Sequence, residues 1–269
     1  MALLRNGSLI AGPATLAACV AVAVIGSKFA DTAQASGNPE AKKPVLVELF
    51  TSEGCSTCPP ADALLQSLDR DQDIPGAQVI VLSEHVDYWD HEGWRDPFSS
   101  PEITARQNAY AFHFSQEASY TPEAVIDGSR GINGSDQRGL TAAIQDAAQR
   151  PKLAIEIANA AMSGKTVEAN VTVAAHPRTD LYAVLADDHD QSSVSKGENS
   201  GKHLEHVAVV RVMKKLGSLN DAFSGQIHVA LPNQSQAQKM RLVIFAQEKG
   251  TGHILGAAEA NLPAASATL

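Results

Sequence analysis

Apolar residues follow two different patterns on the two sides of residue 150. Before it, continuous apolar runs such as VLVELF (45–50) and QVIVLS (78–83) alternate with stretches in which apolar residues recur at helical spacing. Short continuous runs are typical of buried strands, and recurrence at i, i+3, i+4 and i+7 is typical of an amphipathic helix. The first segment is therefore predicted to alternate strands and helices.

Local signals mark the starts and turns of these elements. The face formed by Ala61, Leu64, Leu65 and Leu68 predicts a first helix. Ser100-Pro101-Glu102 predicts the start of a second, a third runs from about residue 140 and ends before Pro151, and Asp127-Gly128 predicts a hairpin. The order β-α-β-α-β-β-α favours a mixed sheet with helices on both faces. Parallel crossovers would bring the ends of strands 45–50 and 78–83 to one edge.

After residue 152 the pattern changes to strands alone. Seven strand-like runs follow, most of them separated by turn-rich stretches: KLAIEIANA, TVEANVTVAA, DLYAVLAD, HVAVVRVMK, QIHVALP, MRLVIFAQE and HILGAAE. Seven short strands in about 110 residues predict an all-β sandwich domain over 152–262, with the strand number of an immunoglobulin domain. The polar segment 187–206 is predicted to be a long exposed loop.

The N-terminus has the pattern of an export signal. Arg5 precedes a long uncharged apolar stretch, and Ala33-Gln34-Ala35 offers a small-x-small cleavage site. We expect a signal peptide at 1–35, a linker at 36–44, and a periplasmic or secreted protein with no stable membrane insertion after cleavage. The alternatives are an uncleaved anchor helix and a lipoprotein modified at Cys19.

Composition and charge narrow the function classes. The chain has 269 residues, 44% of them hydrophobic and 19% charged, which is enough for a substantial core. The net charge is −9 and no basic run is present, so we do not expect a nucleic-acid partner. An acidic surface also disfavours binding to anionic lipid.

The sequence CSTC holds both cysteines of the expected mature chain, Cys55 and Cys58. A lone pair in an oxidising compartment is expected to form a disulfide. Such a short loop gives little stabilisation, so a purely structural role is disfavoured. A thiol at a helix N-terminus has a lowered pKa and is more reactive. We therefore predict Cys55 as nucleophile and Cys58 as resolving thiol, with Pro59 and Pro60 in the first helical turn.

The loop HVDYWDHEGW, expected beside these cysteines, gives an alternative. A copper- or zinc-binding protein or metallochaperone of the envelope could use Cys55, Cys58, His85 and His91, with Asp87 and Asp90 nearby. No pair here has the spacing of a known zinc motif, so we favour an interpretation without metal or cofactor. In that interpretation Trp89 and Trp94 form the rim of the site, together with Tyr88, while the polar residues cap turns. His203 and His206 are expected to be surface or hydrogen-bonding residues.

Residues 45–150 resemble a thioredoxin fold, which would make the chain an α/β thioredoxin-like domain followed by the all-β sandwich. Tyr120-Thr121-Pro122 resembles that family's cis-proline site, which implies that Thr121 and Pro122 position the substrate. Glu48 resembles the family's buried carboxylate, one residue further from the cysteines, which implies a proton acceptor unless it points to solvent. CSTC departs from the usual thioredoxin dipeptide and lacks the following lysine.

Four longer segments, LFTSEGCSTCPPADALL, HVDYWDHEGWRDPFSSPEITARQNAYA, YTPEAVIDG and ENSGKHLEHVAVVR, are more specific. They resemble a family of exported bacterial thioredoxin-like proteins of unknown function, domain of unknown function 1223. The resemblance implies fold and location rather than reaction. We predict a thiol–disulfide oxidoreductase-like protein that acts on a thiol- or disulfide-bearing envelope protein. A non-enzymatic envelope binding module is a further alternative.

Overall fold

Three helices and eleven strands make up the part of the chain that the computed structural model describes, residues 41–231 and 239–262. The predicted signal peptide, Cys19 and most of the predicted linker lie outside these residues. All of these described residues fall in one compact unit. The elements are β1 (Lys43–Thr51), α1 (Pro59–Asp71), β2 (Ala77–His85), α2 (Pro101–His113), β3 (Glu123–Ile126), β4 (Arg130–Asn133), α3 (Gln137–Gln149), β5 (Ile155–Ser163), β6 (Thr166–Val173), β7 (Thr179–Ser193), β8 (His203–Ser218), β9 (Phe223–Ala230), β10 (Met240–Glu248) and β11 (Ile254–Leu262).

The local signals of the first segment predicted its helices and its hairpin correctly. Helix α1 begins at Pro59, so both prolines occupy its first turn, where no intrahelical N–H is needed. Ser100 caps α2, and its hydroxyl accepts hydrogen bonds from the backbone N–H groups of Glu102 and Ile103. Asp127 and Gly128 have φ values of 45° and 58°, as the tight β3–β4 hairpin requires.

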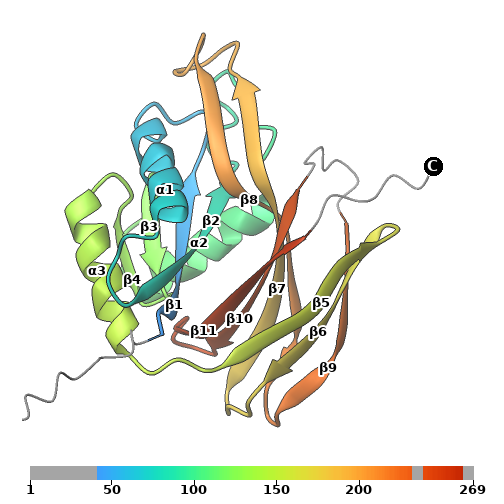
Figure 1. Ribbon diagram of the computed structural model, residues 1–269. Helices are drawn as coiled ribbons and strands as arrows, with labels where there is room; N and C mark the ends of the chain where they lie inside the picture. The colour runs from blue at the N-terminus through green and yellow to red at the C-terminus, as the bar shows by residue number, and fades with distance from the viewer. Residues whose placement is uncertain (1–40, 232–238, 263–269) are drawn as a thin grey trace, which may run out of the picture. The chain divides into compact units, whose positions relative to one another are not determined.

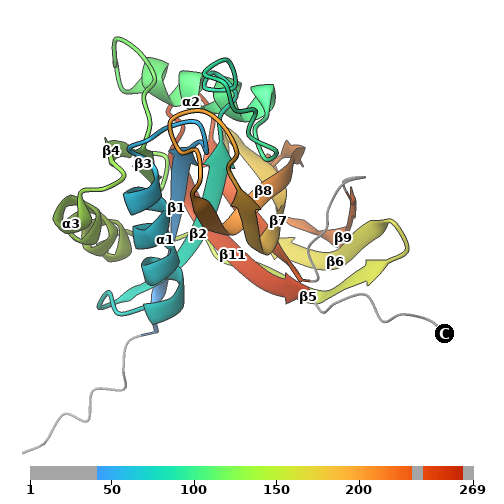
Figure 2. The same ribbon diagram turned by 90° about the horizontal axis from the view of Figure 1, so that it is seen from above.

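One large sheet joins strands from both halves of the chain. Its order is β11-β10-β7-β8-β2-β1-β3-β4, and a second sheet has the order β5-β6-β9. Strands β1 and β2 run parallel from Lys43↔Ala77 to Thr51↔His85, so their C-terminal ends meet at one edge as predicted. Figures 1 and 2 show the helices beside the β1–β4 end of the large sheet and the three-stranded sheet at the other end.

The predicted fold class is wrong. Strands β7, β8, β10 and β11, which we expected in a separate sandwich, continue the sheet of β1 and β2. The junction is the parallel pair β2–β8, in which Ser83 faces Val209. The structure is mainly β, with a mixed eight-stranded sheet and a three-stranded sheet. It is not an α/β thioredoxin-like domain followed by a separate sandwich.

The reason is that β7 and β10 are buried on both faces. Along β10, Val243 and Phe245 belong to the hydrophobic cluster shared with β1, β2 and the helices, whereas Leu242 and Ile244 belong to a second cluster with β6 and β9. Successive side chains of a strand point to opposite faces, so one strand serves two cores. Near-continuous apolar strands are expected where both faces of a sheet are covered.

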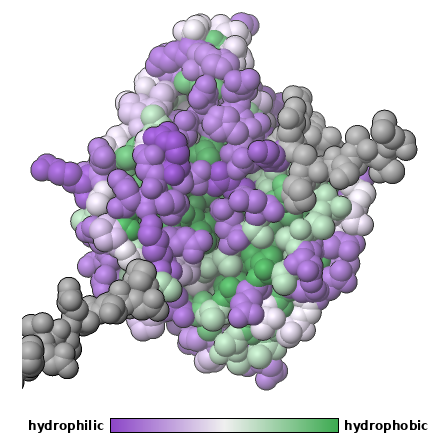
Figure 3. Space-filling view, in the orientation of Figure 1, coloured by the Kyte–Doolittle hydropathy of each residue, from purple (hydrophilic) through white to green (hydrophobic). Residues whose placement is uncertain are grey.

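The predicted exposed loop 187–206 is also wrong. Strands β7 and β8 pair as far as Ser193↔His203, so only residues 194–202 form the turn of this long hairpin. Figures 1 and 2 show the hairpin end beside the N-terminal end of α1. Figure 3 shows that this upper half of the molecule is mainly hydrophilic, whereas hydrophobic side chains gather lower down, over the strands.

Among the described residues, no helix has the length and apolar character needed to cross a membrane.

Candidate functional site

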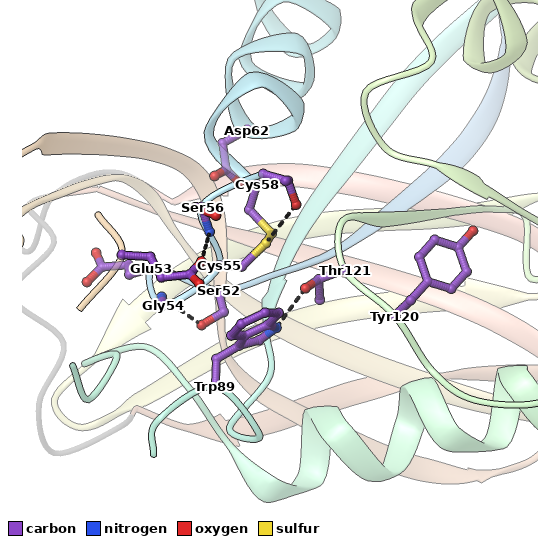
Figure 4. Close-up of a disulfide and its surroundings, with 12 residues drawn as sticks. Ser52, Glu53, Gly54, Cys55, Ser56, Cys58, Asp62, Trp89, Tyr120 and Thr121 are labelled. Atoms are coloured by element: carbon purple, nitrogen blue, oxygen red, sulfur yellow. Dashed lines mark hydrogen bonds between the residues drawn. A yellow bond between two sulfur atoms is a disulfide. The ribbon is translucent and has the colours of Figure 1, made fainter. Parts of the chain in front are cut away.

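The two cysteines lie between the end of β1 and the start of α1, and they are bonded to each other. Their Cα atoms are 5.4 Å apart, and Cys58 is the N-cap residue of α1. The backbone N–H of Cys58 donates to the carbonyl of Cys55 over 3.2 Å, which closes the turn around the disulfide. Both residues have 0% of their surface exposed. The disulfide shown in Figure 4 is therefore formed at a helix N-terminus, and it is covered.

Three predicted site residues lie on one side of the disulfide, as Figure 4 shows for Trp89 and Thr121. Trp89 Nε1 donates a hydrogen bond to Thr121 Oγ1 over 2.8 Å, and the Thr121–Pro122 peptide bond is cis. Trp89 also packs on Gly54, where an added Cβ would lie 2.9 Å from the tryptophan Cβ. The structure thus brings Trp89, Thr121 and Pro122 together with the loop that carries Cys55.

Glu53, which the sequence analysis did not single out, ties this loop to its surroundings. Its carboxylate is fully buried and accepts hydrogen bonds from Trp94 Nε1, over 2.7 Å, and from Ser192 Oγ of β7. Its backbone N–H donates to Asp96 Oδ2 over 2.8 Å. The predicted rim residue Trp94 therefore acts on the site through Glu53. The partners of Glu53 lie more than 40 residues away in the sequence, so no local pattern could predict that its side chain and backbone would bind several of them.

Next to Glu53 lies a buried cluster of titratable groups from β8, α1, β2 and the loop after β2. His206 of β8 was expected to be a surface or hydrogen-bonding residue, but only 1% of its surface is exposed. Its Nε2 lies 3.3 Å from Glu53 Oε1 and its Nδ1 lies 3.9 Å from Asp62 Oδ1. Neither ring nitrogen has a hydrogen bond of good geometry within the described part of the chain. The His206 ring also packs edge-on against the His85 ring at 4.6 Å.

The charges of this cluster shift its pKa values in opposite directions. Burial raises the pKa of Asp62, because the charged carboxylate loses its hydration. Burial opposes protonation of His85, but the carboxylate of Asp96, 2.7 Å from His85 Nδ1, outweighs it and raises the pKa of His85. Burial likewise disfavours the charged form of Asp96, but the same contact with His85 leaves the pKa of Asp96 lowered. His85 and Asp96 therefore form a buried hydrogen-bonded pair in which each partner favours the charged form of the other.

Glu48 lies elsewhere. It is buried, but its carboxylate accepts hydrogen bonds from Arg106 Nε, over 2.6 Å, and from the Tyr110 hydroxyl, over 2.7 Å, both on α2. Side chains alternate along β1, so Thr51 and Leu49 point to the face opposite Glu48. Burial and the nearby charge of Glu48 raise the pKa of Glu84 well above its usual range. The structure does not bring Glu48 to the cysteines, and its partners leave it in an ion pair with Arg106.

The turn of the β7–β8 hairpin covers the disulfide loop, and we call residues 194–202 the cap. Asn199 is fully buried, and its side-chain N–H groups donate to the carbonyls of Glu53, over 2.8 Å, and of Cys55, over 2.9 Å. The Glu198 carboxylate accepts a hydrogen bond from the backbone N–H of Ser56 over 3.1 Å. These residues lie in the segment ENSGKHLEH, whose resemblance to the family was noted, although no functional residue was predicted in it.

The residues of the metal alternative are otherwise engaged. Both ring nitrogens of His85 have partners, Asp96 and the hydroxyl of Ser83, and His91 is exposed. The two sulfur atoms are bonded to each other. Within residues 41–231 and 239–262, no three His, Cys, Asp or Glu side chains are grouped so that they could hold a metal ion.

Fold and site together define a β-rich protein whose mixed sheet carries a covered CxxC disulfide at a helix N-terminus. The chain belongs to the family described as "Protein of unknown function (DUF1223)", whose model matches residues 46–247. The predicted membership of this family of unknown function is thereby confirmed, whereas the match does not bear on export or on a thioredoxin-like fold.

One solved structure has a similar fold, and another matches a smaller part of the chain. The crystal structure of protein AGR_C_4864 from Agrobacterium tumefaciens matches with a TM-score of 0.60 and 25% identity, over 81% of this chain and 94% of that one. A domain of the outer membrane lipoprotein Omp28 from Porphyromonas gingivalis matches with a TM-score of 0.29 and 13% identity, over 42% of this chain and 89% of that one. The search of curated proteins returned no match.

Proposed function

We propose that this protein is a thiol–disulfide exchange protein of the cell envelope, and that Cys55 and Cys58 form its redox pair. The observation that supports the proposal most directly is the position of the disulfide at the N-terminus of α1, beside Trp89 and the cis Thr121–Pro122 peptide bond. A disulfide that closes so short a loop contributes little to stability, so its position is better explained by chemistry.

In the proposed exchange, the sulfur atom of Cys55 is the one that is attacked. A thiolate of the partner protein attacks Cys55 Sγ, the Cys55–Cys58 bond breaks, and Cys58 leaves as a thiolate that takes up a proton. A second partner thiolate then attacks the mixed disulfide and releases Cys55. The partner loses two electrons and becomes a disulfide, and the pair gains them as two thiols. The reverse reaction reduces a partner disulfide.

The surroundings support the roles given to the two cysteines. The helix dipole of α1 stabilises a thiolate at its N-terminus, which favours the leaving group and lowers the thiol pKa. Thr121 lies near the disulfide in Figure 4, and Thr121 and Pro122 would position the backbone of a substrate. Cys55 directly precedes Ser56 and Thr57, which are exposed, so the partner would approach from this turn.

Single serine variants test the proposal. Cys58→Ser is expected to accumulate mixed disulfides with cysteine-containing peptides, because the resolving thiol is missing. Cys55→Ser should form none and should lose turnover of a dithiol peptide. Mass spectrometry of the non-reduced protein detects the adducts, and peptide oxidation gives the turnover.

The double Cys55→Ser, Cys58→Ser variant is the control for stability. If the wild-type disulfide is reduced by dithiothreitol but no variant forms a peptide adduct and no dithiol peptide is oxidised, the proposed function is wrong. A binding module with a structural disulfide would then be the better description.

A further inference from the structure

The disulfide lies at a position that favours exchange, but the surrounding protein keeps other thiols from reaching its sulfur atoms. Cys55 and Cys58 have no exposed surface, although Ser56 and Thr57 between them are exposed. Exchange requires in-line approach of a thiolate to a sulfur atom, so the closed form is unreactive toward any thiol that cannot enter. Whatever covers the pair therefore determines which thiols react with it.

The cap is attached to the disulfide loop by polar contacts more than by apolar packing. Seven of its nine residues, all but Val194 and Asn199, are exposed. Asn199 bridges the carbonyls of Glu53 and Cys55, and Lys202 Nζ donates to Asn199 Oδ1 over 2.8 Å, which orients the amide. Gly197 of the cap lies against the loop that carries Trp94, since a Cβ added to the glycine would be 3.2 Å from Trp94 Cβ. Few contacts would have to break for the cap to open.

These contacts have the donor and acceptor pattern of a polypeptide backbone. The Asn199 amide donates two hydrogen bonds to main-chain carbonyls, and Glu198 accepts one from the main-chain N–H of Ser56. With the cap displaced, the loop Glu53–Ser56 presents two carbonyls and one N–H beside the disulfide. An extended peptide can satisfy such a row of backbone groups with its own N–H and C=O groups.

We propose that the cap occupies the binding surface for an extended, cysteine-containing polypeptide, and that Asn199 is the residue that closes it. This inference rests on the proposed function for its partner, because that function requires a thiol-bearing protein. In the closed state Asn199 and Glu198 take the place of the partner's backbone. A partner that binds the loop displaces the cap and exposes Cys55 to its own thiolate, whereas a free small thiol must wait for spontaneous opening.

Reduction rates of the oxidised full-length protein test the cap directly. Asn199→Ala should raise the second-order rate of reduction by dithiothreitol about tenfold, because two hydrogen bonds that hold the cap closed are lost. Asn199→Asp should raise it at least as much, since a carboxylate cannot donate to the two carbonyls. Asn220→Ala, the same exchange on an exposed turn before β9, is the matched control and should leave the rate unchanged. Glu198→Ala removes an exposed acceptor and tests the cap if the Asn199 variants do not fold.

A second comparison tests the polypeptide surface. A cysteine-containing hexapeptide and N-acetylcysteine amide, matched in thiol pKa, are reacted with the wild type and with Asn199→Ala. With the wild type we expect the peptide to react faster than the small thiol, because only the peptide gains backbone partners on the loop when the cap is displaced. Asn199→Ala should accelerate both reactions, since the contacts of Asn199 must break in each. Equal rates of the two thiols with the wild type would overturn the peptide surface, and unchanged rates in all cap variants would overturn the cap altogether. Both results are independent of turnover, so they are distinct from failure of the proposed function.

Discussion

At the scale of single residues, the site depends on buried polar groups that come from distant parts of the sequence. Glu53 is held by Trp94, Ser192 and Asp96, and it lies 3.3 Å from His206. A buried charge is costly unless it is paired, so each member of this cluster constrains the others. The cluster ties the loop before Cys55 to β7 and to the loop after β2.

Asp62, one turn into α1, is expected to make stability depend on pH. Burial raises the pKa of Asp62 in the folded state. Protonation of such a carboxyl group adds to the free energy of unfolding. This contribution is complete below the unfolded-state pKa, about 3.9, and is lost as the pH rises through the folded-state pKa. The Asp62→Asn variant does not lose this stability, because an asparagine side chain does not titrate. The variant should therefore gain stability relative to the wild type between pH 4 and pH 7, by about 1.4 kcal/mol for each unit of the shift. Urea unfolding at both pH values measures the difference.

Asp73→Asn makes the same exchange at an exposed position just after α1 and is the control. If the difference in free energy of unfolding between Asp62→Asn and the wild type is the same at pH 4 and pH 7, the pKa of Asp62 is not raised.

At the scale of elements, a backbone contact joins the two sheets where the chain passes from α3 into β5. The Leu153 N–H donates to the Leu255 carbonyl over 2.7 Å, just before β5 and within β11. At Gly256 an added Cβ would overlap the carbonyl oxygen of Leu153 and lie 3.0 Å from its carbonyl carbon. The neighbouring atoms belong to the backbone, which cannot rotate away, so this contact requires glycine for space rather than for conformation.

Gly256→Ala is predicted to lower the free energy of unfolding by about 3 kcal/mol, because the backbone of β11 or of the segment before β5 must shift. Gly225→Ala in β9, where the nearest atom to an added Cβ is 3.7 Å away, is the matched control and should change stability little. Guanidinium titration followed by circular dichroism measures both. A loss in Gly256→Ala no larger than in Gly225→Ala would mean that the sheets are less tightly joined.

At the scale of the whole described structure, one hydrophobic cluster unites the two halves of the sequence. It contains Val45 and Leu82 from the first half and Val184, Val210 and Phe245 from the second. The parallel pairing of β2 with β8 continues the hydrogen-bonded sheet across the same junction. Neither half can bury its apolar surface alone.

The described unit is therefore expected to unfold in one cooperative transition. Scanning calorimetry of the full chain should show a single peak whose van't Hoff and calorimetric enthalpies agree. A fragment of residues 41–151 should fail to fold, since it would expose the edge of β2 and the cluster beneath it. Two separate transitions, or a stable fragment, would instead support two independent domains.

The sequence predicted the helices and strands of the first segment well, but it did not predict how the strands of the two segments assemble into sheets. Every helix and strand from β1 to α3 follows from local signals such as Ser100, the two prolines after Cys58, and Asp127-Gly128. The sandwich was expected because seven strands in a row suggest two sheets that pack on each other. The apolar runs of β7 and β10 carried the contrary signal, because strands with both faces buried belong inside a larger assembly. Of the predicted site, the cysteines, Trp89, Thr121 and Pro122 lie together, whereas Glu48 lies with Arg106.

The sequence by itself determined the elements from β1 to α3, the CxxC pair at the start of a helix and the family, because each depends on residues that are near one another in the chain. It did not determine that β7 and β8 extend into residues 187–206. Only the tertiary structure decided that the two halves share one sheet, that Glu53 and His206 meet, and that Asn199 covers the disulfide. These contacts join residues about 140 or more positions apart. Their formation depends on strand pairing and on the burial of both faces of β7 and β10, which no local pattern specifies.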